Sequence, residues 1–201
     1  MRIYEDKANK VGKHNLKNEW WASKGIEVVR VPLPVGDYVL ENEKIADLIT
    51  RKAKRGIEIK KMDFLGTYNL SVDSKYAIQE LIQDIQSEHG RFRDELILAQ
   101  NNNIELYIVV ENKGGYLNSK KTIWNDDVHS IDDLYNWKNP RAFYYKGGKR
   151  LYPNCNGGEW LAKCCITMQN KYGCKFVFCT PEESAEVITK ILQGGGLSGG
   201  T

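Results

Sequence analysis

The four residues Val72-Asp73-Ser74-Lys75 have the types and the spacing that phosphate chemistry needs. Side chains alternate between the faces of a strand, so Asp73 and Lys75 project together while Val72 turns toward the core. A carboxylate beside an ammonium group can hold a hard metal ion and a water next to a phosphate. Asp37 offers a second carboxylate in another predicted strand. Two acids and a lysine on one sheet are the minimal set for a Mg²⁺-dependent nuclease.

The elements that must position these residues are a strand and the helix that follows it. Asn69–Lys75 is predicted to be the strand that carries Asp73. The run Tyr76–Glu88 predicts an amphipathic helix, because Ile78, Leu81, Ile82 and Ile85 recur at i, i+3, i+4 and i+7. His89-Gly90 is expected to end this helix, and Arg91–Gln100 to form the next one.

The rest of the chain alternates between strands and helices. The predicted strands are Ile26–Leu33, Val35–Leu40, Leu106–Val110 and Lys175–Cys179, and the predicted helices are Ile131–Trp137, Glu159–Tyr172 and Glu182–Leu192. A tight turn at Pro34 would make the first two strands antiparallel neighbours. Thr180, Pro181 and Glu183 suggest a capping box for the last helix. The pattern indicates an α/β domain over residues 1–193, with a central mixed sheet flanked by helices, and a disordered tail over 194–201.

Composition limits the function classes. The chain of 201 residues is 41% hydrophobic and 27% charged, as expected for one globular domain. It has neither a long apolar stretch nor a secretory signal, which predicts a cytoplasmic protein without a membrane span. GxxxxGK[ST] does not occur, and the one GxGxxG match, at residues 194–199, lies in the predicted tail after no strand, so no nucleotide cofactor is expected. The five cysteines favour buried free thiols over disulfides or zinc ligands.

Positive charge is concentrated in residues 50–61, which hold six basic residues and one acid. Residues 45–61, which include this segment, are predicted to form either another strand or an extended basic loop. A basic segment near a metal site suits a polyanionic substrate, although a solvated hairpin that serves only solubility is the alternative. The candidate DNA-binding residues of this segment are Arg51, Lys52, Lys54, Arg55, Lys60 and Lys61.

The order GDY, DSK, helix, GRF, helix and IVVE resembles the XPF-type structure-specific endonuclease domain. That family belongs to the PD-(D/E)XK nuclease superfamily and carries the pattern GD…ERKxxxD. Gly36-Asp37 matches its GD, and Asp73-Ser74-Lys75 takes the place of ERK. Gly90-Arg91 and Val110-Glu111 match two later motifs. The resemblance covers about residues 1–112, and the final helix-strand-helix is similar to that of compact phage and bacterial members.

Three positions depart from the family pattern. Ala8-Asn9 replaces the Arg-Glu that follows the first acidic residue, for which Asp6 is the candidate here. Gln79 stands where the pattern has Asp, and Glu80 can replace it if the helix begins one residue later. The gap between Asp37 and Asp73 is widened by the basic segment, which suggests an insertion that lies against DNA.

The resemblance implies hydrolysis of DNA phosphodiesters with Mg²⁺ or Mn²⁺. Asp37, Asp73, the Ser74 backbone carbonyl and Glu80 would hold the metal ion, and Lys75 would orient the attacking water. Asp6 and Glu111 are candidates for an additional acidic site. Arg91 and Arg93 would contact phosphate, or instead pair with neighbouring acids.

The family also implies a context for this chemistry. Branched or structured DNA, a homodimer, and a phage or mobile-element origin with action in a bacterial host cytoplasm are expected by resemblance alone. The chief alternative is a catalytically inactive DNA-binding accessory protein of the same fold. A small-molecule enzyme is a weaker alternative, and Gly36-Asp37 could serve only turn chemistry.

Overall fold

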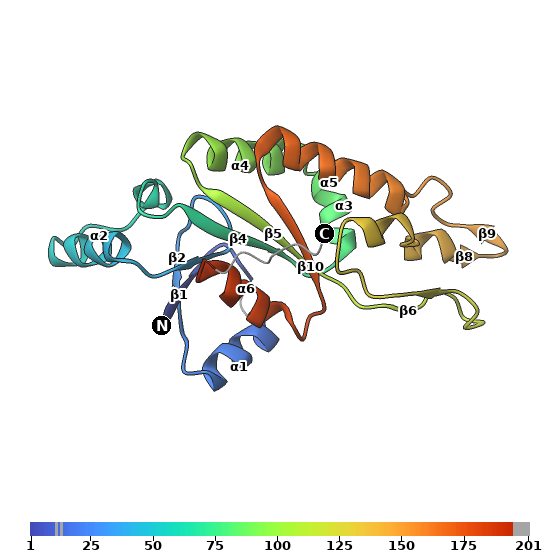
Figure 1. Cartoon of the computed structure of the whole chain (residues 1–201), viewed down its shortest axis with the longest axis horizontal. Coiled ribbons are helices and arrows are strands. Elements are labelled where there is room, and N and C mark those ends of the chain that lie inside the picture. Colours follow the sequence, from blue (N-terminus) through green and yellow to red (C-terminus); the bar gives the residue numbers. More distant parts are fainter. Residues whose placement is uncertain (11, 13, 195–201) are drawn as a thin grey trace.

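The computed structural model describes residues 1–10, 12 and 14–194, and its centre is a six-stranded mixed sheet (Figure 1). The strand order is β10-β5-β4-β3-β1-β2. The strands are β1 (Arg2–Asp6), β2 (Glu27–Val31), β3 (Tyr38–Leu40), β4 (Leu70–Lys75), β5 (Glu105–Glu111) and β10 (Lys175–Cys179). β4, β5 and β10 pair in parallel, as do β1 and β2, whereas β3 is antiparallel to both of its neighbours.

The strand order corrects the predicted hairpin between the second and third strands. β2 pairs with β1, and β3 lies between β1 and β4. The residues between them do not close a tight turn, because β3 pairs with β1 and β4 instead of with β2. The segment Leu33-Pro34-Val35-Gly36 therefore crosses over the end of β1 and enters the middle of the sheet.

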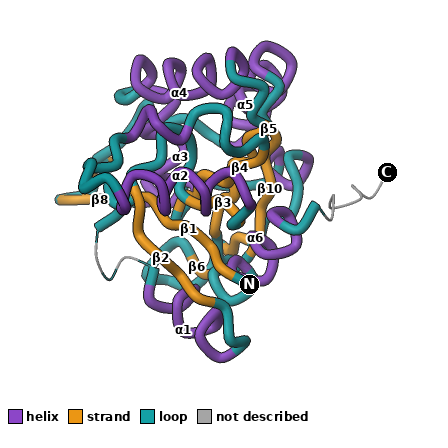
Figure 2. Tube along the Cα trace, turned by 90° about the vertical axis from the view of Figure 1, so that its left-hand side faces the viewer, coloured by secondary structure: helices purple, strands orange, loops and turns teal. Residues whose placement is uncertain are grey.

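Helices cover both faces of the sheet, which makes three layers (Figures 1 and 2). One face packs against α3 (Ile78–Gln86), α4 (His89–Asn101) and α5 (Gly158–Tyr172), and the other against α1 (Asn15–Ser23) and α6 (Ser184–Leu192). Two apolar clusters result, one on each face of the sheet. The prediction of α/β architecture with a helix-flanked mixed sheet is confirmed.

The helices after β4 follow their apolar periodicity. Ile78, Leu81 and Ile82 are buried, so the predicted stripe of α3 faces the sheet. The predicted stop at His89-Gly90 is wrong, because α3 ends at Gln86 and these two residues begin α4. α1 was not predicted, since its apolar pattern is weak and it buries little more than Lys17 and Trp21.

The predicted strand or extended loop over residues 45–61 is wrong for its first part. Residues 45–54 belong to α2 (Glu43–Lys54), and residues 55–60 connect this helix to a short 3₁₀ helix, η1 (Lys61–Phe64). Asn42 caps α2 by accepting a hydrogen bond from the Ile45 amide, and Ile45 and Leu48 are buried one turn apart. The apolar residues at i and i+3 were therefore the missed helical signal. Figure 1 shows α2 at one end of the molecule.

The segment between β5 and α5 forms two short hairpins at the opposite end of the molecule from α2 (Figure 1). The hairpins are β6–β7 (Gly115–Tyr116 with Trp124–Asn125) and β8–β9 (Tyr145–Lys146 with Lys149–Arg150). Two 3₁₀ helices lie between them, η2 (Asp132–Tyr135) and η3 (Pro140–Phe143). η2 replaces the helix predicted near 131–137 and packs against α5.

Several smaller predictions can be compared with the structure. All five cysteines are free thiols, and Cys165, Cys174 and Cys179 are buried. The predicted N-cap at Thr180 is wrong, because α6 begins at Ser184 with Glu183 as its N-cap; Thr180 instead donates from its amide and its hydroxyl to the Glu183 carboxylate in the preceding turn. The predicted disordered tail lies, beyond Gly194, outside the described residues. Within the described ranges, no helix is both long enough and apolar enough to cross a bilayer.

Candidate active site

A tight Gly-Asp turn places Asp37 at the start of β3. Gly36 has a positive φ of 72°, and a Cβ at this position would lie 2.1 Å from the Ser71 hydroxyl oxygen. The Asp37 amide donates to the Val72 carbonyl at 2.7 Å, while its carbonyl accepts from the Asp6 amide at 2.8 Å. Only glycine fits this close approach, so the turn holds Asp37 between β1 and β4.

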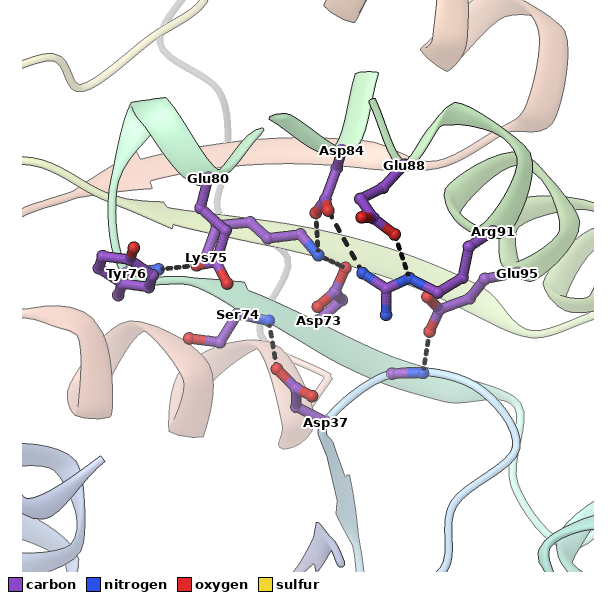
Figure 3. A network of polar contacts seen from close by, with 11 residues as sticks. Asp37, Asp73, Ser74, Lys75, Tyr76, Glu80, Asp84, Glu88, Arg91 and Glu95 are labelled. Atoms are coloured by element: carbon purple, nitrogen blue, oxygen red, sulfur yellow. Dashed lines mark hydrogen bonds and ion pairs between the residues drawn. The ribbon is translucent and has the colours of Figure 1, made fainter. Parts of the chain in front are cut away.

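The strand directions bring three predicted acidic or basic positions to one edge of the sheet. β1 and β4 run in the same direction, and β3 runs oppositely between them. The end of β1 at Asp6, the start of β3 beside Asp37 and the end of β4 at Lys75 therefore meet. The Ser74 amide donates to the Asp37 carboxylate at 2.9 Å, which fixes Asp37 beside Asp73 (Figure 3).

Lys75 lies between two carboxylates. Its Nζ is 2.7 Å from Asp73 Oδ2 and 2.7 Å from Asp84 Oδ2, and all three residues are buried. Figure 3 shows the lysine extending from β4 toward both acids. Burial lowers the pKa of Lys75, but the two carboxylates outweigh burial, so its pKa lies well above its ordinary value and the amine stays charged.

Two carboxyl groups at this edge of the sheet have raised pKa values. Burial, together with the charge of Asp73, raises the pKa of Asp37 to about 8. The same two causes raise the pKa of Glu95, on α4, to about 7. Glu95 accepts a hydrogen bond from the Gly36 amide at 2.8 Å, so it supports the turn that carries Asp37. The site therefore holds more acid than its own lysine can neutralise.

These residues line a cleft of about 650 Å³. Its acidic lining residues are Asp6, Asp37, Asp73, Glu80, Asp94 and Glu95, and its basic ones are Lys10, Lys61, Lys75 and Arg91. Arg91 is exposed and lies near Asp84 and Glu88, at 3.4 Å and 3.5 Å. Asp6, Asp37 and Asp73 lie at the end of the sheet, and the other acids come from α3 and α4. Lys61 and Arg91 supply positive charge from η1 and α4.

The structure places most of the predicted metal ligands at this cleft. Asp37, Asp73 and Ser74 line it, and so does Glu80, whose carboxylate accepts from the Tyr76 amide at 2.7 Å. Asp6 also lines it, with one carboxylate oxygen accepting from the Leu33 amide. Glu80 reaches the cleft because α3 begins at Ile78, which places Glu80 in the first turn.

Glu111 lies elsewhere. Its side chain is on the opposite face of the sheet, where it pairs with Lys17 of α1 and accepts a hydrogen bond from the Ser184 hydroxyl of α6. Successive residues of β5 face opposite sides, and Val110 faces the α3–α5 layer. The structure therefore separates Glu111 from the other candidate acids.

Only some of the predicted DNA-binding residues lie at the cleft. Lys61 and Arg91 line the cleft, whereas Arg51, Lys52, Lys54 and Arg55 belong to α2 or its end and do not. Lys52 pairs with Asp63 at 2.5 Å, and Arg51 with Asp47 at 3.1 Å. Arg93 pairs with Asp94, and Lys60 is likewise outside the cleft lining.

Asp84 and Glu95 are the site residues that sequence reasoning missed. Asp84 is a buried acid on the helix of the apolar stripe, and an acid that faces the core of an amphipathic helix is the signal that could have found it. Glu95 carries no such signal, because it is one of two consecutive acids in α4. Only the crossover that brings Gly36 to α4 gives Glu95 its position.

The donor set fits a divalent cation. Asp37 and Asp73 are neighbouring carboxylates at a cleft, and their mutual repulsion is a cost that bound positive charge would relieve. Among the described residues, no group of three or more His, Cys, Asp or Glu side chains is already arranged as a complete metal site. A cation here would need at least one further oxygen, and Glu80 and Ser74 also line the cleft.

The mixed central sheet flanked by helices has the restriction-endonuclease-like fold of XPF nuclease domains. The ERCC4 domain family matches residues 9–191, and the chain belongs to this family. The predicted resemblance to XPF-type nuclease domains is thereby confirmed.

Solved structures of similar fold agree with this assignment. XPF from Aeropyrum pernix superposes with a TM-score of 0.52 at 15% identity, covering 98% of this chain and 66% of that one. The same protein in complex with DNA gives 0.52 at 14% identity, covering 96% and 63%. The chain thus spans slightly less than two thirds of these XPF chains. A comparison with curated proteins finds no match.

Proposed function

We propose that this protein is a metal-dependent DNA endonuclease whose active site is the cleft around Asp37, Asp73 and Lys75. The observation that carries the proposal is the surplus of acid in the lining of a cleft to which Lys61 and Arg91 also contribute. Membership of the ERCC4 domain family and the fold shared with a DNA-bound XPF support it.

Each residue of the site has its own role in the proposed phosphodiester hydrolysis. Asp37 and Asp73 would hold Mg²⁺ or Mn²⁺, with Glu80 or the Ser74 carbonyl completing the oxygen ligands. The bound ion would supply a Lewis acid for the phosphate and a water of lowered pKa. Lys75, kept charged by Asp73 and Asp84, would orient the attacking water and offset the charge that develops on the phosphate.

Other residues would position Asp37 or contact the DNA. Glu95 and Gly36 keep Asp37 in position, because the Gly36 amide donates to the Glu95 carboxylate. Lys61 and Arg91 would contact the DNA backbone on either side of the scissile phosphate. Branched DNA as the preferred substrate, a homodimeric assembly and a role in phage replication or recombination extend this proposal by family resemblance.

Cleavage of defined DNA structures tests the proposal. Labelled flap, fork, four-way junction and duplex DNA would be incubated with Mg²⁺, Mn²⁺ or chelator, comparing the wild type with Asp73→Asn. We expect metal-dependent cutting by the wild type and none by the variant. Asp47→Asn, an exposed change on α2, is the matched control and should cut normally.

Salt-sensitive DNA binding without cutting, unchanged by Asp73→Asn, would identify a DNA-binding accessory module and refute the catalytic assignment. Melting curves in chelator separate loss of function from loss of fold. These curves are needed because Asp73→Asn removes one of the two buried ion pairs of Lys75 while it also relieves the repulsion of Asp37.

A further inference from the structure

The two hairpins between β5 and α5 form a second groove, away from the active-site lining. The groove has a volume of about 780 Å³ and is lined by both hairpin segments, Tyr116 to Ile123 and Phe143 to Leu151. None of its lining residues belongs to the candidate active site. Nothing in the chemistry proposed above uses this part of the molecule.

The groove and its rim carry a group of large aromatic side chains that remain in contact with solvent. These side chains are between 43% and 58% exposed, and they are Tyr116, Trp124, Tyr144, Tyr145 and Tyr152. Tyr116 and Trp124 pack edge to face at 4.7 Å, as do Tyr144 and Tyr152 at 6.1 Å. Large aromatic rings gathered at the surface in this way mark an interaction site rather than a core.

Positive charge accompanies the rings. Neither segment 115–125 nor segment 143–152 contains an Asp or Glu, while together they hold Lys120, Lys121, Lys146, Lys149 and Arg150. In the described part of the chain, none of these five is paired with a carboxylate. Gly147 and Gly148 both have positive φ, so a tight two-residue turn presents Lys146 and Lys149 at the hairpin tip.

Aromatic faces combined with unpaired cations are the chemistry that binds single-stranded nucleic acid. Bases stack on the rings without regard to sequence, and the cations contact the phosphates. A duplex cannot use the rings in this way, because its bases are already stacked. We propose that the groove between the β6–β7 and β8–β9 hairpins binds a single strand of DNA.

The position of the groove relates it to the active site. A neighbouring depression of about 300 Å³ also includes Leu151, and it continues to Ile82 and Gln86 of α3. The same helix presents Glu80 and Asp84 to the active-site region. A strand lying in the groove would thus approach the cleft along α3. The inference deepens the proposed function, on which it rests, by assigning a single-stranded arm of the substrate to these hairpins.

Binding to a labelled oligonucleotide in the absence of metal tests this inference. The probe is a fluorescent oligothymidylate of about 20 nucleotides, longer than one typical binding site, followed by anisotropy in chelator at low salt. We expect the double variant Tyr144→Ala with Tyr145→Ala to bind about tenfold more weakly. Tyr144→Phe with Tyr145→Phe should keep the wild-type affinity, because the rings remain.

Two further variants control the experiment. Tyr135→Ala removes a ring of similar exposure outside the groove and should not change binding. Lys146→Gln with Lys149→Gln should reduce the salt dependence of log K by about one unit or more. This charge variant leaves the aromatic packing intact, so it decides the question if the alanine variant fails to fold.

Three results would overturn the inference. They are wild-type binding by both the alanine and the charge variants, an equal loss in Tyr135→Ala, and a strong preference for RNA of the same length. The test is independent of catalysis. Strand binding that depends on these residues in a protein that cuts nothing would support the groove and refute the nuclease. DNA cleavage by a protein whose strand binding does not depend on these residues would support the nuclease and refute the groove.

Discussion

Each face of the sheet has a buried lysine paired with a carboxylate, Lys75 of β4 on one face and Lys17 of α1 on the other, and the two sites differ in charge balance and in access. Lys75 lies between Asp73 and Asp84, beside the further acid of Asp37, at an open cleft. On the other face Lys17 pairs with Glu111, which also accepts from the Ser184 hydroxyl. The same residue types thus occur in two surroundings.

The comparison separates a site suited to chemistry from a site that joins elements. Lys17 and Glu111 balance one to one, and they link α1 and α6 to the end of β5 away from water. The Lys75 site has more acid than base, and burial with like charge raises the pKa of Asp37 to about 8. Unbalanced charge at an open cleft can bind a cation and a phosphate, whereas a buried pair of opposite charges under two helices leaves neither partner available to a ligand.

Replacing the cleft lysine should have the largest effect. Lys75→Met removes the charged group from the proposed water and phosphate, and we expect cleavage to fall by about 100- to 1000-fold. Single-turnover cleavage with saturating metal, measured well below the melting temperature, checks this. Activity within a few-fold of wild type would show that Lys75 only balances Asp73 and Asp84, as Lys17 balances Glu111.

Replacing the lysine of the other face should affect stability instead. Lys17→Met leaves Glu111 buried without its cation and should lower the free energy of unfolding by about 3 kcal/mol. Cleavage per folded molecule should not change. Denaturant unfolding measures the first quantity. The control is Lys190→Met, which breaks the exposed pair with Glu186 on α6 and should cost less than about 1 kcal/mol. Loss of cleavage without loss of stability in Lys17→Met would contradict the division between the faces.

Removing the excess acid should stabilise the metal-free protein. Asp37 and Glu95, with pKa values of about 8 and about 7, keep their protons in the folded state at pH values where the unfolded chain has lost them. The folded state binds more protons, so stability falls as pH rises from about 4 to 8. We expect Asp37→Asn to flatten this decline and, near pH 8, to stabilise the protein by at least about 1.4 kcal/mol, the equivalent of one pKa unit.

Binding of a metal ion should stabilise the folded protein, whereas a rise in pH toward 8 should destabilise it. Mg²⁺ or Mn²⁺ should raise the melting temperature of the wild type at neutral pH, because it binds only the folded state. Asp37→Asn should lose this increase. A wild type whose stability neither declines toward pH 8 in chelator nor rises with metal would contradict the charge imbalance inferred for the cleft.

The smallest expected effect is on duplex binding by two basic regions, the cleft lining and α2. Lys61→Gln and Arg91→Gln, at the cleft, should each weaken duplex binding modestly and reduce its salt dependence by about one unit. The matched changes on α2 are Arg51→Gln and Lys54→Gln, which should alter binding less. Binding titrations over a salt series distinguish the two regions. An equal or larger loss from the α2 variants would restore the DNA-binding role that the sequence predicts for that segment.

Local sequence patterns were sufficient for the elements that carry their own periodicity. The β4–α3 unit, β5, α5 and β10 match their predicted ranges closely, because apolar alternation and the helical stripe report burial directly. The α2 helix was mistaken for a strand or loop because its basic residues hid the short apolar repeat. The hairpin of β2 and β3 was wrong because β1, far away in sequence, pairs with both strands.

The sequence by itself determined the chemistry that is available: the Gly36-Asp37 turn, the Asp73 and Lys75 pair on a strand, and the order of motifs that identifies the family. The tertiary structure alone decided which acids act together. Parallel and antiparallel pairing brings Asp6 and Asp37 beside Lys75, adds Asp84 and Glu95 from two helices, and sends Glu111 to the other face. The charge imbalance at the cleft, and with it the predicted affinity for a cation, depends on distances between residues that are far apart in the sequence.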